Sequence, residues 1–155
     1  MLDEASADYP HATKIIGANL ICDNEKFDTF VSQHRWAVLT TLRTDGSACS
    51  SMVAYARQGD ELLVSTPGFT FKRKTIDQDP RVSLCVISNQ EPFSFVNVEG
   101  EALVETADLV EGTRAVFANI ESAGYELPEN LPDWLENQQR VIIRIIPGRV
   151  SGVIR

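Results

Sequence analysis

The stretch from Trp36 to Thr66, WAVLTTLRTDGSACSSMVAYARQGDELLVST, contains three short apolar segments separated by two turn signals. Short runs of β-branched and aromatic residues are typical of strands, and the glycines in Thr44–Ser47 and Gln58–Asp60 are typical of tight turns. The predicted strands cover residues 36–42, 48–56 and 61–66. Because both connections are short, we expect these strands to form an antiparallel meander.

Strands also dominate the rest of the chain. Pro67-Gly68 ends the third strand, and Thr70 is placed to cap a short helix that ends before Pro80. Further strands are predicted over 82–87, 94–105, 141–146 and 149–154, with Pro147-Gly148 between the last two. Helices are predicted over 24–34, 108–120 and 132–139, and Thr106 or Asp108 is expected to cap the second of these. Six or seven strands without a βαβ rhythm indicate a mainly β (α+β) fold, an antiparallel barrel with two to four short helices.

Composition is typical of one globular domain. The chain has 155 residues, of which 43% are apolar and 23% are charged. Residues 1–22 show no steady period and are predicted to form an N-terminal arm, and residues 23–155 the domain. The acidic N-terminus does not resemble a secretory signal, and no segment is long and apolar enough for a membrane span, so we expect a cytoplasmic protein without membrane contacts.

The net charge and the cysteine content argue against several classes of site. A net charge of −8 argues against nucleic-acid binding, which needs a basic surface. The three cysteines, widely spaced and without a CxxC pair, predict neither a disulfide framework nor a metal site. Against this acidic background, Lys72-Arg73-Lys74 stands out as either a solvated helix face or an anion-binding group.

Several motifs in a characteristic order carry a family resemblance. They are Leu39–Leu42 followed by Asp45-Gly46, then Glu61–Thr66, Lys72–Ile76, Asp79–Leu84 and Val98–Gly100. With them, the chain resembles the flavin-binding split β-barrels of the pyridoxamine 5′-phosphate oxidase-like family, including members that use the deazaflavin coenzyme F420. The resemblance spans roughly residues 25–153 and implies an antiparallel split β-barrel that forms a homodimer with its cofactors at the subunit interface.

The resemblance also implies a set of cofactor-binding residues. Residues 50–55 match the strand along the flavin ring, with Ser50, Ser51, Met52, Val53 and Tyr55 as contacts, although Tyr55 could face the core instead. Ser65 and Thr66 match the pair at the ring and ribityl chain. Lys72 matches the lysine that binds the cofactor phosphate, and Lys74 is a second basic contact. Trp134 is a secondary candidate that could equally serve packing. The cofactor is then FMN or, as the alternative, coenzyme F420.

Two positions depart from the family pattern. Relatives often place an arginine just before the phosphate-binding lysine, whereas this chain has Phe71 there. The C-terminal residues 148–155 lack the arginine- and histidine-bearing motif of the true pyridoxamine phosphate oxidases, so we do not expect pyridoxamine phosphate as the substrate. A short helix beginning near Thr70 would still present free backbone N–H groups to a phosphate beside Lys72.

Two functional hypotheses follow. The first is an oxidoreductase that transfers a hydride or electron pair between FMN or F420 and a small organic substrate, with no catalytic acid or base that the sequence identifies. The second is a non-catalytic module that binds a flavin or haem. Haem favours a histidine ligand, and the chain offers His11 and His34.

Overall fold

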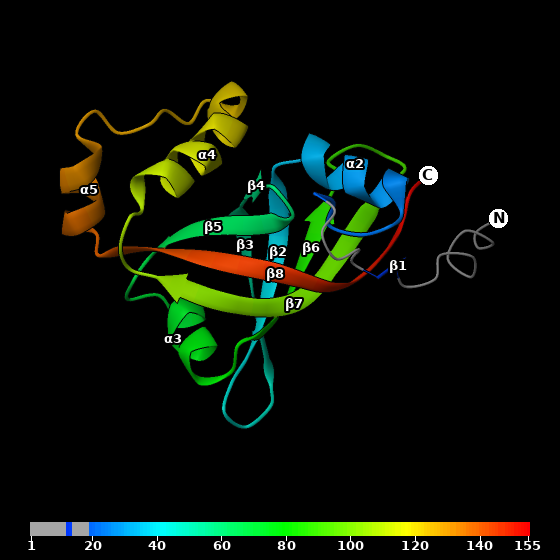
Figure 1. Ribbon diagram of the computed structural model, residues 1–155, viewed down its shortest axis with the longest axis horizontal. Coiled ribbons are helices and arrows are strands. Elements are labelled where there is room, and N and C mark those ends of the chain that lie inside the picture. Colours follow the sequence, from blue (N-terminus) through cyan, green and yellow to red (C-terminus); the bar gives the residue numbers. More distant parts are fainter. Residues whose placement is uncertain (1–11, 14–18) are drawn as a thin grey trace.

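A computed structural model describes residues 12–13 and 19–155 of the chain. One antiparallel sheet curls into a half-barrel, with its strands in the order β3-β2-β6-β7-β8-β5-β4 and the two-residue β1 paired to β8 (Figure 1). The strands are β1 (Ala12–Thr13), β2 (Trp36–Leu42), β3 (Ala48–Ala54), β4 (Ala56–Gln58), β5 (Glu61–Pro67), β6 (Arg81–Ile87), β7 (Phe95–Glu105) and β8 (Arg140–Val153). The predicted antiparallel split barrel, mainly β with α+β character, is confirmed.

A break at Tyr55 lets the sheet curl. The predicted single strand over 48–56 is wrong, because β3 ends at Ala54 and β4 begins at Ala56. Before the break the chain pairs with β2, and after it with β5, which lies at the opposite end of the strand order. The Tyr55 N–H leaves the ladder and donates to the Arg35 carbonyl at 3.2 Å. The two ends of the sheet are therefore brought together by one bent segment.

The C-terminal strand is longer than expected. Residues 141–146 and 149–154 were predicted as separate strands, but β8 runs through Pro147-Gly148 without interruption. Opposite Glu99 and Gly100 of β7 the register shifts by one residue, so that a β-bulge accommodates the extra residue. Proline lacks an N–H donor and is tolerated at such an irregularity, which is why it does not end the strand here.

Helices lie around the sheet. Their bounds are α2 (Glu25–Gln33), α3 (Phe71–Gln78), α4 (Val110–Ile120), a 3₁₀ turn (Glu121–Ala123) and α5 (Leu131–Asn137). Asn24 caps α2 by accepting from the backbone N–H groups of Lys26 and Phe27. The predicted cap of α4 is wrong: its N-cap is Leu109, because Asp108 adopts a left-handed backbone with φ 56°.

The core fills the curled sheet, and α4 covers part of its outside. Alternate residues of each strand point inward, among them the fully buried Leu39, Leu84 and Ile143. On the outer face, Ile142 of β8 packs with Val116 of α4 in a second apolar cluster. The outer face of residues 141–146 is therefore covered in part by α4.

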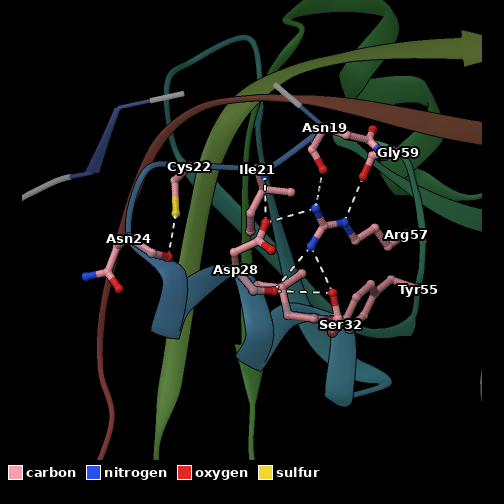
Figure 2. Close-up of polar contacts among 10 residues, drawn as sticks. Asn19, Ile21, Cys22, Asn24, Asp28, Ser32, Tyr55, Arg57 and Gly59 are labelled. Carbon is pink, nitrogen blue, oxygen red and sulfur yellow. Dashed lines mark hydrogen bonds and ion pairs between the residues drawn. The ribbon is translucent and has the colours of Figure 1, made fainter. Parts of the chain in front are cut away.

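A cluster of polar contacts around Arg57 connects the segment before α2 to the barrel (Figure 2). Arg57 of β4 forms an ion pair with Asp28 at 2.8 Å and donates to the carbonyls of Asn19 and Gly59. Its remaining donors reach the Asp28 carbonyl and the Ser32 hydroxyl. A cavity of about 600 Å³ adjoins this cluster. Because the donors of Arg57 are engaged within the protein, we assign the cluster a structural role.

Candidate functional site

Two cationic side chains lie close together where α3 begins and β8 begins. Lys72 is in the first turn of α3, and Arg140 opens β8 opposite Pro67 of β5. Burial lowers the pKa of Lys72, and the positive charge of Arg140 lowers it further, while Cys49 acts in the opposite direction. Burial lowers the pKa of Arg140 to about 10. Each group is thus partly desolvated, and desolvation disfavours its charged form.

No carboxylate in the described part of the chain compensates these two charges. Among residues 12–13 and 19–155, neither Lys72 nor Arg140 forms an ion pair. The Arg140 Nε atom is buried and has no hydrogen-bond partner within the described part of the chain. Partly buried charges without a counter-charge are unfavourable, and a bound anion removes that penalty. The pair is therefore a candidate anion site, and lysine with arginine is a combination suited to a phosphate.

Neighbouring side chains fix the orientation of Arg140. Its Nη2 donates to the Ser65 hydroxyl at 2.8 Å, and its Nη1 donates to the Gln138 side-chain carbonyl at 3.1 Å. The Trp134 ring lies under the guanidinium, 4.4 Å from ring centroid to Cζ, and meets Phe117 edge-on at 5.7 Å. A cation held over an indole face is stabilised by the ring quadrupole. Strand β5 and helix α5 thus hold the guanidinium between them.

The start of α3 adds backbone donors to this site. Thr70 is the N-cap, as predicted, but its side chain does not cap the helix and donates instead to the Pro67 carbonyl at 3.0 Å. The first N–H groups of α3 therefore have no side-chain acceptor and carry the partial positive charge of a helix N-terminus. Phe71, which stands where relatives often have an arginine, lies under Arg43 at 5.3 Å. The second cation of the site is therefore Arg140, which comes from strand β8 and not from α3.

The predicted β3 residues divide between the two faces of the sheet. Val53 belongs to the core and is 7% exposed, so alternation places Ser51 on the inner face as well. Ser50 and Met52 point outward: the Ser50 hydroxyl lies 2.8 Å from that of Thr40, and Met52 is 60% exposed. The outward pair is available to a ligand that lies along β3.

The predicted pair on β5, Ser65 and Thr66, is likewise divided between the two faces of the sheet. Ser65 lies on the outer face and is joined to Arg140. Thr66 is 3% exposed, and its hydroxyl lies 3.2 Å from that of Thr70. Of the two, the structure brings Ser65 directly to the cationic pair, while Thr66 supports the turn that leads into α3.

Three further predicted residues lie in different surroundings. Tyr55 is fully buried and donates its hydroxyl to the Val31 carbonyl, and burial raises its pKa. Lys74 is exposed on α3, so the structure does not bring it into the same half-buried environment as Lys72. Trp134 packs between Phe117 and Arg140 and therefore acts on the site through Arg140. Direct contacts of these residues with a cofactor stay predictions.

Arg140 is the site residue that the sequence interpretation missed. It stands immediately before the apolar run 141–146 and two residues after Gln138. A positive charge at the first position of a strand is ordinary at a solvated strand end, and only its pairing with Pro67 shows that it faces Ser65. A tryptophan six residues earlier, on a short helix, was the available signal, because indole rings often stack on arginine.

Comparison with known proteins identifies the family. The family model described as pyridoxamine 5′-phosphate oxidase matches residues 23–153. The chain belongs to the pyridoxamine 5′-phosphate oxidase family. Its matched region contains Lys72, Ser65 and Arg140 together with every strand from β2 to β8. No curated protein matches the chain in sequence.

Several solved structures share the fold at low sequence identity. A structure named F420 reductase has 20% identity and a TM-score of 0.67, covering 83% of this chain and 98% of its own. An FAD-binding protein from Mesorhizobium loti has 20% identity and a TM-score of 0.62, with 82% and 91% covered. A haem-binding protein from Mycobacterium smegmatis has 20% identity and a TM-score of 0.65, with 83% of this chain but only 52% of that protein covered.

Two features are absent from the described residues. None of the helices in residues 19–155 is long and apolar enough to cross a membrane. Within the same part of the chain, no three histidine, cysteine, aspartate or glutamate side chains are grouped so that they could hold a metal ion.

Proposed function

We propose that the protein is a flavin-type oxidoreductase that transfers a hydride or electron pair between FMN, or alternatively coenzyme F420, and a small organic substrate. The observation that carries the proposal is the pair of half-buried, uncompensated cations, Lys72 and Arg140. Both cofactors bear a phosphate, and a phosphate at this position would neutralise the pair. Family membership and the structural likeness to an F420 reductase and an FAD-binding protein support the same assignment.

The residues of the chain have distinct tasks in this proposal. When bound, the cofactor ring supplies the acceptor or donor of the hydride. Lys72, Arg140 and the first N–H groups of α3 bind the phosphate. Ser65 orients Arg140 and would contact the chain that links phosphate and ring. The outward Ser50 and Met52 of β3 would offer the cofactor a polar and an apolar contact.

A homodimer is part of the proposal. Met52 is 60% exposed, and its cross-strand neighbour Val38 pairs in turn with Cys85 of β6. Neither Val38 nor Cys85 is fully buried in the single chain. A second copy of the chain over this outer face would exclude water from β3, where the ring is proposed to lie.

The alternative is a non-catalytic module that binds a flavin or haem. A haem-binding protein shares the fold, so this alternative has a structural counterpart. His34, however, stacks on Phe30 with ring centroids 3.8 Å apart, and its Nδ1 lies 2.8 Å from the Phe30 carbonyl. The other histidine, His11, lies outside the described residues. Because His34 is engaged in these contacts, a phosphate-bearing cofactor is favoured over a haem ligated by this histidine.

Titration with each cofactor tests the proposal. We expect FMN or F420 to change its absorption on binding, and the bound cofactor to be reduced by a nicotinamide or dithionite donor and reoxidised by an added acceptor. Binding without any change of redox state under these conditions would favour the non-catalytic module. Binding of haem alone would refute the oxidoreductase assignment.

A further inference from the structure

A second cavity lies on the other side of Arg140, outside the surface assigned to the cofactor. It has a volume of about 570 Å³ and is lined by Gly68, the loop between β7 and α4, helix α5 and the start of β8. Helix α5 and the start of β8 lie together at the left of Figure 1. Much of its wall is apolar. The apolar residues are Ala107, Leu109, Val110, Pro132, Leu135 and Val141. Volume and lining are those of a small-molecule pocket.

Two guanidinium groups complete the wall of this cavity. They belong to Arg73 and Arg140, whose Nε atoms are the buried side-chain polar atoms of the described residues that lack a hydrogen-bond partner. The rest of the Arg73 guanidinium is engaged, because its Nη1 donates to the Gly68 carbonyl at 3.1 Å. Its Nε forms an ion pair with an Asp77 oxygen at 3.0 Å, without hydrogen-bond geometry, so this one donor is left without an acceptor. Unsatisfied buried donors are rare in folded proteins, and two on one cavity indicate a missing acceptor.

Backbone strain is concentrated at the same place. Within residues 12–13 and 19–155, the only non-glycine residues with positive φ are Asp108 (56°) and Gln139 (49°), and both line this cavity. The carbonyl of Gln139 accepts a hydrogen bond from the Gly68 N–H at 2.7 Å, which holds the strained residue in place. Strained backbone that the surrounding structure maintains is commonly associated with ligand sites.

We propose that this cavity binds a carboxylate attached to an aliphatic chain, with the carboxylate on Arg73 and Arg140 and the chain against the apolar wall. Guanidinium groups bind carboxylates through paired, charge-assisted hydrogen bonds. The carboxylates of Asp108 and Glu136 also line the cavity, but both side chains are exposed, and solvent screens their repulsion. This inference goes beyond the proposed function, because the cavity does not require a bound cofactor.

Such a carboxylate has two possible sources. It is either a free organic acid or an acidic extension of the cofactor, because the phosphate of F420 continues into a tail that carries glutamates, whereas the phosphate of FMN is terminal. In the second case the ligand would pass Arg140 on its way from the phosphate site into the cavity. The second source rests on the proposed function, and the first does not.

The test uses the cofactor-free full chain and hexanoate as the probe, observed by amide shifts in NMR. We expect shifts at residues that line the cavity and an affinity that Arg73→Gln weakens by about tenfold or more. Arg114→Gln, an exposed arginine on α4, is the charge-matched control and should bind as the parent does. Val110→Phe should fill the cavity and abolish binding, while Val110→Ala should leave it intact.

A second arm covers the other source. F420 with its glutamates and F420 from which they have been removed are titrated into the parent and into the Arg73→Gln and Val110→Phe variants. A preference for the full tail that both variants abolish supports the cavity as the tail site. If hexanoate shifts no cavity residue and the two forms of F420 bind equally, the inference is wrong, and tight binding of both forms would still leave the proposed function intact.

Discussion

Replacement of Lys72 by alanine should weaken FMN binding while leaving riboflavin binding almost unchanged. Riboflavin lacks the phosphate, so a lysine that acts only on the phosphate should distinguish the two ligands. Loss of one charge-assisted hydrogen bond costs about 1.5–3 kcal/mol, which corresponds to roughly ten- to hundred-fold in affinity. The structure favours the upper part of this range, because Lys72 is half-buried and shares the site with an uncompensated Arg140.

Two neighbours on α3 provide matched controls. Lys74 is exposed, and Arg73 is occupied by the Asp77 carboxylate and the Gly68 carbonyl. We therefore expect Lys74→Ala to have a smaller effect than Lys72→Ala, and Arg73→Ala the smallest. Quenching of flavin fluorescence measures all the affinities. If Lys72→Ala binds FMN as the parent does, or loses riboflavin to the same extent, the phosphate role of Lys72 is refuted.

Further predictions address cofactor, assembly and core. Saturating FMN or F420 should raise the melting temperature, since a ligand at about 100 times its Kd stabilises the fold by roughly 2.7 kcal/mol; no shift with either cofactor would argue against both. Light scattering should give a dimer at micromolar concentration, and Met52→Glu should shift it toward monomer; a parent monomer would contradict the proposal. Tyr55→Phe should cost about 0.5–1.5 kcal/mol of unfolding free energy without changing the Kd for FMN, because it removes one core hydrogen bond. Burial raises the pKa of Tyr55, so the neutral hydroxyl contributes stability that is fully present below the ordinary value of 10.0 and is lost as the pH rises above it. Above that value the free energy of unfolding should therefore fall more steeply with pH in the parent than in Tyr55→Phe.

The fold was largely predictable because its signals are local. Alternation and turn glycines placed the strands, and the family motifs gave the barrel. The errors arose where tertiary pairing overrode a local signal. Proline normally ends a strand, but the bulge opposite Glu99 and Gly100 lets β8 continue. Tyr55 was ambiguous because the chain bends there, and the bend turns its side chain into the core.

The site was only half predictable for the same reason. Lys72 follows Ser65 closely in the sequence, so a motif could place both. Arg140 lies 75 residues from the Ser65 hydroxyl that it contacts, and no local pattern reports that pairing. Alternation along β3 and β5 also means that adjacent residues such as Ser65 and Thr66 cannot both face one ligand from the same side of the sheet.

A crystal structure of the protein with FMN is the most direct test of the central claim that Lys72 and Arg140 form the cofactor phosphate site. We predict phosphate oxygens within hydrogen-bond distance of Lys72 Nζ and of the Arg140 guanidinium, with the guanidinium still on Ser65 and Trp134. A phosphate bound elsewhere, for example in the cavity beside Arg57, or a flavin whose phosphate contacts neither cation, would contradict it.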